Sequence, residues 1–178
     1  MYTALKYSVI VSRLLLLAVF TTGSAPNSAR AQSGPHATIL ARGGGKTIIQ
    51  GGTGQPGFVP VVTTIAFHAE QSGQVISGDF ECLALAPAAA TGIGSGQFTV
   101  NVMYVTGQIT GLQVQGDMAT LQGTATITGL GVGSNVPFTL VVRKGGPGST
   151  ATLTTQGSPH LVFNEILLEG AFEISGGD

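Results

Sequence analysis

Charge, tryptophan and cysteine are all scarce in this chain of 178 residues. Charged residues make up 8% of the sequence, aromatic residues make up 6%, and tryptophan is absent. The single cysteine, Cys82, has no partner for an internal disulfide, so an exported form must be stabilised by burial of apolar surface alone. One cysteine also excludes the paired-cysteine spacings of zinc sites. No serine stands in the G-x-S-x-G pattern of a nucleophile elbow.

Basic residues are few, and they become fewer if the N-terminal segment is removed. The chain has seven Lys and Arg against eight Asp and Glu, and three of the seven basic residues precede residue 32. The remainder has four basic residues and all eight acidic residues, a net charge of −4. A nucleic-acid partner needs several Lys or Arg on phosphates, and an anionic membrane surface needs a polybasic stretch. We expect neither partner.

Residues 1–31 have the three parts of a secretory signal peptide. Lys6 and Arg13 give a positive start, Leu14–Phe20 is the apolar centre, and a small-residue stretch ends at Ala31. We place the cleavage site before Gln32. The apolar run is shorter than the ~20 residues of a spanning helix, and no second run of that length follows. We expect a secreted or periplasmic protein whose residues 32–178 form a single domain without a transmembrane segment.

Short segments of alternating hydrophobicity, separated by glycine turns, fill residues 32–178 and predict strands rather than helices. The expected strands are Lys46–Gln50, Val61–Gln71, Gln74–Leu85, Gln97–Val105, Thr106–Val114, Met118–Thr128, Val136–Lys144, Ser149–Thr155 and Glu165–Ile174. Gly43–Gly57 (around the first of these strands) and Ala86–Gly96 are expected to be loops. The pattern predicts an all-β fold, either an antiparallel β-sandwich or a small β-barrel of about eight to ten strands.

Two hairpin registers follow from the turn residues. A two-residue turn at Ser72–Gly73 places Ile65 opposite Phe80, so that the apolar residues of both strands share one face. A turn at Gly116–Asp117 suits type II′, which has glycine in its first central position.

The other face of the first hairpin carries His68, Glu70, Ser77, Asp79 and Glu81. In the predicted register His68 lies opposite Ser77, with Asp79 one diagonal away. One hypothesis is a divalent metal site using His68, Glu70 and Asp79. Another is a catalytic acid/base arrangement of His68 with Asp79 and Glu81, in which a carboxylate orients the imidazole. The alternative is the solvated face of an edge hairpin, and the choice depends on whether this face lines a cleft.

One group of glutamates and the single cysteine each have a chemical and a structural interpretation. Glu165, Glu169 and Glu173 share one parity, and paired carboxylates can hydrolyse a glycosidic bond, but we expect them on the polar outer face of the last strand. The single tyrosine after residue 31 and the absence of tryptophan also argue against a sugar enzyme. We expect Cys82 to be a buried thiol, because the local sequence supplies no histidine to activate it.

Two glycine clusters resemble phosphate-binding loops without meeting their requirements. Gly92–Gly96 lacks the strand–turn–helix setting of a dinucleotide fingerprint. Gly44–Thr47 resembles the end of a Walker loop, but Leu40 stands where the first glycine of that motif belongs. We expect both to be ordinary loops, and we expect no organic cofactor.

Four stretches carry a family resemblance: Gly78–Cys82, Lys144–Gly148, Phe163–Gly170 and the Gly43–Gly45 opening. Together they resemble small, uncharacterised secreted bacterial β domains, and in particular the β modules that follow choice-of-anchor domains in cell-surface proteins. The resemblance implies an extracellular interaction or structural module, and it supplies no catalytic residues. We expect this chain to depart from that arrangement by standing alone, without an anchor or partner domain.

Three functional hypotheses remain open. The first is an exported non-catalytic module that binds an extracellular ligand or protein, or builds a structure. The second is a small secreted enzyme or metal-binding protein that uses the His68/Asp79 face. The third is a barrel that carries a small lipophilic ligand, as the low charge and the doubly apolar segment Gln97–Val105 suggest. A homo-oligomer formed through an exposed strand edge is also an open alternative.

Overall fold

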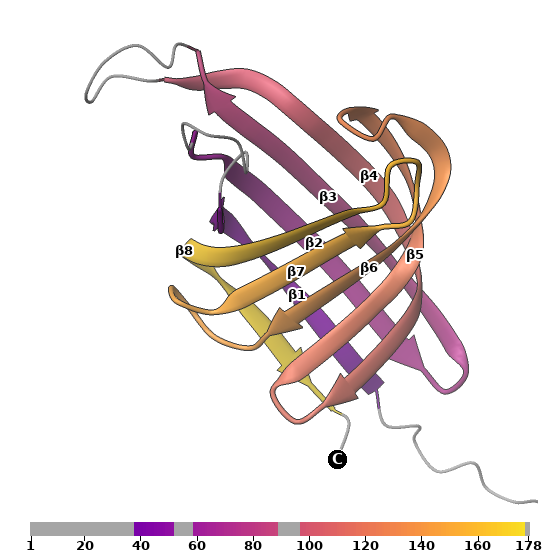
Figure 1. Ribbon diagram of the computed structural model, residues 1–178. Coiled ribbons are helices and arrows are strands. Elements are labelled where there is room, and N and C mark those ends of the chain that lie inside the picture. Colours follow the sequence, from indigo (N-terminus) through magenta and orange to yellow (C-terminus); the bar gives the residue numbers. More distant parts are fainter. Residues whose placement is uncertain (1–37, 52–58, 89–96, 177–178) are drawn as a thin grey trace, which may run out of the picture. The chain divides into compact units, whose positions relative to one another are not determined.

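The computed structural model describes residues 38–51, 59–88 and 97–176, which form eight antiparallel strands closed into a barrel (Figure 1). The strands are β1 (Thr38–Ile49), β2 (Val62–Ser72), β3 (Val75–Pro87), β4 (Phe98–Gln115), β5 (Met118–Gly129), β6 (Gly133–Arg143), β7 (Thr150–Thr155) and β8 (Leu161–Ser175). These residues include no helix that is long and apolar enough to cross a membrane. The predicted all-β fold is confirmed, and of the two predicted architectures the barrel is the observed one.

Each strand pairs with the next along the chain, and β8 returns to pair with β1. The C-terminal ends of β1, β3, β5 and β7 lie at one end of the barrel, called here the loop end (Figure 1). The tight turns β2–β3 and β4–β5 lie at the other end, called the turn end. Because the barrel closes, no described strand is left as an edge, and the proposed route to a homo-oligomer through a free edge loses its basis. The homo-oligomer itself stays a prediction.

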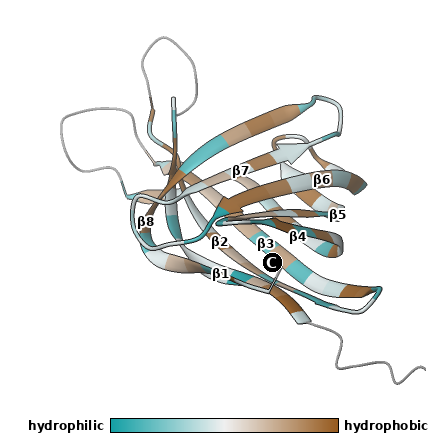
Figure 2. Ribbon diagram, turned by 90° about the horizontal axis from the view of Figure 1, so that it is seen from below, coloured by the Kyte–Doolittle hydropathy of each residue, from teal (hydrophilic) through white to brown (hydrophobic). Residues whose placement is uncertain are grey.

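Alternation along the strands directs apolar side chains inward and polar side chains outward, as Figure 2 shows by the change of hydropathy along each ribbon. Two phenylalanine pairs lie in the interior. Phe67 and Phe172 lie with ring centroids 5.5 Å apart, and Phe80 stacks on Phe138 at 5.1 Å. Aromatic pairs at these separations add stability beyond the area they bury.

Inward-facing glycines make room for these rings. A Cβ atom on Gly107 would lie 2.7 Å from the ring of Phe138, and one on Gly43 would lie 2.8 Å from the ring of Phe172. The expectation that Gly43–Gly57 is a loop around a short strand is therefore wrong for its first part. Gly43–Gly45 lies inside β1, where glycine lets a ring and the neighbouring backbone approach closely.

The first hairpin has the predicted faces but a different register. Its turn is Gly73–Gln74 rather than Ser72–Gly73, and Phe67, not Ile65, lies opposite Phe80. Gly73 has φ 62°, so glycine takes the first of the two turn positions, where a positive φ is required in a type II′ turn. The observed pairing differs from the predicted one by two residues. Side chains on a strand alternate with a period of two, so the inward residues remain inward.

The second hairpin turns at Gly116–Asp117, as predicted, and Gly116 has φ 60°. Its first strand is longer than expected. The segments Gln97–Val105 and Thr106–Val114 are one continuous strand, β4, because nothing in the sequence between them breaks the ladder with β5. The predicted loop Ala86–Gly96 begins later than expected, since β3 extends to Pro87, and residues 89–96 lie outside the described part.

Candidate ligand site inside the barrel

The predicted polar face of the first hairpin lies on the outside of the barrel. His68 lies directly opposite Asp79, and Glu70 lies opposite Ser77, so the expected pairing of His68 with Ser77 is corrected. His68, Asp79 and Glu81 are exposed and Glu70 is half-buried. The register shift thus brings His68 and Asp79 closer together than the sequence predicts.

His68 belongs to a polar row that crosses six strands in register. The row consists of Glu173, Arg42, His68, Asp79, Gln108 and Thr124. The guanidinium of Arg42 pairs with Glu173 at 2.7 Å, which places a positive charge on the strand next to His68. No group of three metal-binding side chains gathers among the described residues. The metal site of His68, Glu70 and Asp79 stays a prediction.

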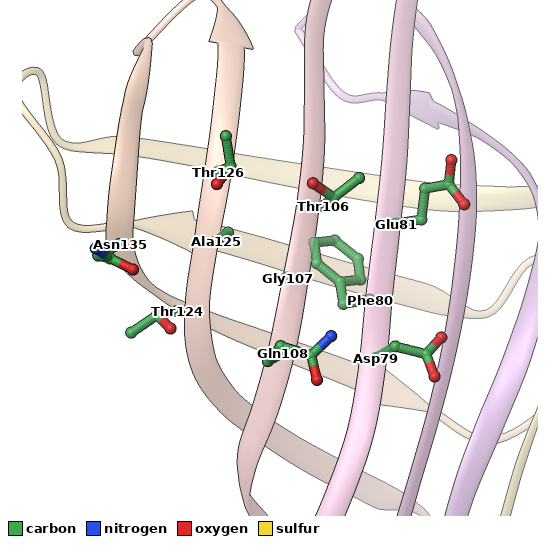
Figure 3. Close-up of a pocket in the computed structure, with 10 residues that line it drawn as sticks. All are labelled: Asp79, Phe80, Glu81, Thr106, Gly107, Gln108, Thr124, Ala125, Thr126 and Asn135. Atoms are coloured by element: carbon green, nitrogen blue, oxygen red, sulfur yellow. The ribbon is translucent and has the colours of Figure 1, made fainter.

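A shallow depression of about 410 Å³ lies beside this row, on the outer surface of β3–β6 (Figure 3). Asp79 and Glu81 form one side of it, and it continues over Thr106, Gln108, Thr124, Thr126 and Asn135. His68 does not line it. The three residues of the proposed acid/base group, His68, Asp79 and Glu81, therefore do not all face this depression. Glu81 accepts a hydrogen bond of 2.5 Å from the hydroxyl of Tyr104, and this bond raises the pKa of that tyrosine.

The barrel interior holds a different polar group, which the sequence analysis places wrongly. Glu165 is 2% exposed and points inward between the apolar residues of β8, whereas Glu169 and Glu173 are outside. The reason is a register shift in the β1–β8 ladder, where Lys46 pairs with Glu169 but Thr47 pairs with Leu167. The extra residue on β8 reverses the side-chain parity, so the three glutamates do not share a face.

Two threonines on neighbouring strands bind the Glu165 carboxylate. Thr47 of β1 and Thr63 of β2 lie opposite each other, and both are fully buried. The hydroxyl of each donates to Oε2 of Glu165, and the two hydroxyls also contact each other. These three residues are called here the Glu165 cluster. Within the described residues no hydrogen bond reaches Oε1.

No positive charge compensates Glu165 in the described part of the chain. Its surroundings are apolar, and burial raises the pKa of the Glu165 carboxyl, while the hydrogen bonds from Thr47 and Thr63 lower it. An ionised carboxylate taken out of water without a cation is costly. A carboxyl that is retained in such a place, with a pKa displaced by burial, is a recognised mark of a functional site.

Cys82 lies in the same interior and is 1% exposed. Burial raises the pKa of its thiol well above the usual value, and the charge of Glu165 adds to the effect. A nucleophilic thiolate needs the opposite displacement of the pKa. The prediction that Cys82 is a buried thiol is confirmed.

The interior wall beside the cluster is lined by small and flexible residues. The inward row through the two threonines consists of Leu167, Thr47, Thr63, Ala84 and Met103. Another inward hydroxyl, that of Thr155 on β7, is buried and has no hydrogen-bond partner among the residues that the structure describes. The sequence holds a signal for Glu165, because Phe163, Glu165 and Leu167 alternate as one inward face. The three threonines give no such signal, since threonine is frequent on both faces of strands.

The remaining residues that the sequence analysis considers lie either on the outer surface of the barrel or outside the described residues. Gly44–Thr47 is part of β1 and not a loop, and Lys46 points outward to Glu169 at 3.2 Å. His160 is exposed in the β7–β8 link. Gly92–Gly96 and His36 lie outside the described residues.

Comparison with known proteins found no matching family model, no matching curated protein and no matching solved structure.

Proposed function

We propose that the protein is an exported, non-catalytic binding protein that holds one small, mainly apolar molecule inside the barrel, beside Glu165. The observation that carries the proposal is the Glu165 cluster, a carboxylate with two hydroxyls on the inner wall of an otherwise apolar barrel. This is the lipophilic-ligand hypothesis of the sequence analysis, with a polar anchor added to it.

General properties of small barrels support this choice. A barrel of eight strands either fills its interior with side chains or holds one small ligand there. Ligand sites in barrels combine apolar walls with a few polar groups that orient the molecule. The cluster supplies such groups, and the hydroxyl of Thr155, for which the described residues provide no hydrogen-bond partner, is a further buried polar atom inside the barrel. Apolar residues of the same volume are often at least as stabilising as buried charged groups, so stability alone gives no reason to bury a carboxyl here.

The test compares an inward and an outward alanine on neighbouring strands. Ala84 of β3 is buried and lies opposite Thr63, whereas Ala66 of β2 is exposed on the outer surface. Isothermal titration calorimetry with 1-octanol is carried out on the wild type, Ala84→Leu and Ala66→Leu. The proposal predicts one site per chain in the wild type, unchanged affinity in Ala66→Leu and affinity about tenfold lower in Ala84→Leu.

Circular dichroism shows whether Ala84→Leu is folded, since added volume in a packed interior costs about 1–3 kcal/mol. Saturable binding that is equal in the two variants places the site elsewhere and contradicts the proposal. Absence of saturable binding in the wild type contradicts it as well.

A second candidate is a divalent metal on the outer face, favoured by the direct opposition of His68 and Asp79. Elemental analysis of the purified protein, with thermal melting before and after a chelator, tests it. The metal hypothesis predicts about one metal per chain and a melting temperature that falls on chelation and in His68→Ala. His160→Ala is the matched control, because His160 is also exposed and is not on this face. No metal, with equal melting of the two variants, removes this candidate.

A further inference from the structure

We infer that the molecule held inside the barrel carries a protonated amine that pairs with the carboxylate of Glu165. The inference rests on the proposed function and deepens it, because it names the chemical class of the ligand as a small hydrophobic amine.

The basic side chains of the described residues all lie on the outer surface of the barrel. Arg42 pairs with Glu173 at 2.7 Å, Lys46 with Glu169 at 3.2 Å and Arg143 with Asp117 at 2.9 Å. These pairs are on the outer surface, with all six side chains more than half exposed. Lys144 is exposed beyond the last residue of β6. The described basic side chains are thus on the outside, and none of them pairs with Glu165.

The carboxylate of Glu165 can accept more hydrogen bonds than the two that Thr47 and Thr63 donate. An ionised carboxylate only accepts hydrogen bonds, and each oxygen can accept more than one. The hydroxyls of Thr47 and Thr63 both donate to Oε2, and within the described residues Oε1 receives no donor. Any further hydrogen bond to an ionised Glu165 must come from another donor. A primary ammonium group has three donors and no acceptor, and its bond to a carboxylate is stronger than that of a neutral hydroxyl.

An amine fits the site beside Glu165 better than a carboxylic acid or an alcohol of similar size. A carboxylic acid ligand brings a second negative charge next to Glu165, and like charges at close range disfavour each other. An alcohol offers one donor and no charge, so it leaves the carboxylate uncompensated. The apolar residues around the cluster, among them Ile49 opposite Glu165 and Ile65 on the next strand, suit an alkyl or aryl body on the ligand.

The experiment compares three probes with the same chain length: octylamine, 1-octanol and octanoate. Affinities are measured by calorimetry at about pH 8, where the amine is protonated and the acid is ionised. The inference predicts that the wild type binds octylamine about tenfold more tightly than 1-octanol, and octanoate more weakly than either. In Glu165→Gln the advantage of octylamine over 1-octanol disappears, while the affinity for 1-octanol stays within about threefold of the wild type.

Glu169→Gln is the matched control, because it removes an exposed carboxylate from the same strand and leaves the interior unchanged. It should bind the three probes as the wild type does. The order of the probes in the wild type is a test that needs no variant, so a poorly folded Glu165→Gln does not prevent a decision.

The outcomes distinguish the two proposals. If 1-octanol and octylamine bind the interior with equal affinity, the ligand class is wrong and the proposed binding function stands. If octanoate binds most tightly, the inference is also overturned. If no probe binds saturably, or if binding is indifferent to Ala84→Leu, the proposed function fails and the inference fails with it.

Discussion

Replacing Glu165 with glutamine is expected to stabilise the unliganded protein at neutral and alkaline pH. Glutamine is nearly isosteric with glutamate and still accepts hydrogen bonds from Thr47 and Thr63, but it carries no charge into the apolar interior. The perturbation therefore removes the cost of the buried charge and keeps most of the geometry.

The magnitude follows from two opposing effects. Desolvation of an ion in a protein interior costs several kcal/mol, and each hydrogen bond to a charged group stabilises it by about 1.5–3 kcal/mol. Hydrogen bonds to the neutral amide return about 1 kcal/mol each. Burial has a larger effect on the pKa of Glu165 than the two hydrogen bonds. The cost of burying the charged carboxylate therefore exceeds the stabilisation by Thr47 and Thr63. We expect Glu165→Gln to be more stable by about 1–3 kcal/mol at pH 8, or roughly 4–10 °C in Tm for a domain of this size.

The pH dependence has a definite sign. The fold raises the pKa of Glu165 above its value in the unfolded chain, about 4.3, so the folded state binds the proton more tightly. The wild type then loses stability as the pH rises from about 4.3 through the folded pKa, and the full cost of the charge is present above that value. Near pH 4 the side chain is mostly protonated in both states, and the difference between the variant and the wild type should fall below about 0.5 kcal/mol.

Urea denaturation followed by circular dichroism at about pH 4, 6 and 8 measures this difference. Glu169→Gln, which removes an exposed ion pair, should change stability by less than about 0.5 kcal/mol at each pH. A Glu165→Gln protein that is less stable than the wild type at pH 8 would refute the reasoning. A gain in stability that is the same at all three pH values would refute it too, because it would not come from the charge.

Three further outcomes are expected. Gly107→Ala should lose about 1–3 kcal/mol in the same denaturation assay, because the new Cβ meets the ring of Phe138 at 2.7 Å; an unchanged midpoint would show that the ring has room to move. The thiol of Cys82 should resist a thiol reagent in the native protein at about pH 8 and react at once in urea, whereas fast native labelling would contradict its burial and raised pKa. Absorbance titration of Tyr104 should show a raised pKa that falls towards the ordinary value in Glu81→Gln, and equal titration curves would exclude the hydrogen bond as the cause.

The parts of the fold that depend on local alternation are predictable from the sequence. The turn Gly116–Asp117 and the buried position of Cys82 follow from side-chain parity and turn chemistry, and both are observed. Closure of the sheet does not follow, because the pairing of β8 with β1 joins residues about 120 positions apart, and alternation is the same in a sandwich and in a barrel.

The candidate site was missed for a related reason. Parity counting along the last strand assumes a regular ladder, but the register shift opposite Lys46 and Thr47 turns Glu165 inward while Glu169 remains outside. A bulge of one residue has no signature in the composition of this segment. The sequence predicts a loop at Gly43–Gly45 because glycine is usually rare in strands, whereas in the structure Gly43 lies in β1 and makes room for the ring of Phe172.

The most direct test of the account locates the bound molecule by methyl NMR of the alanine-labelled protein during titration with octylamine. Ala84 and Ala151 are inward and buried, and Ala66 and Ala171 are outward and exposed. The account predicts saturable shifts of the Ala84 and Ala151 methyl signals, with those of Ala66 and Ala171 unmoved. Shifts confined to the outward methyls, or no saturable shift at any of the four, would contradict a ligand site inside the barrel.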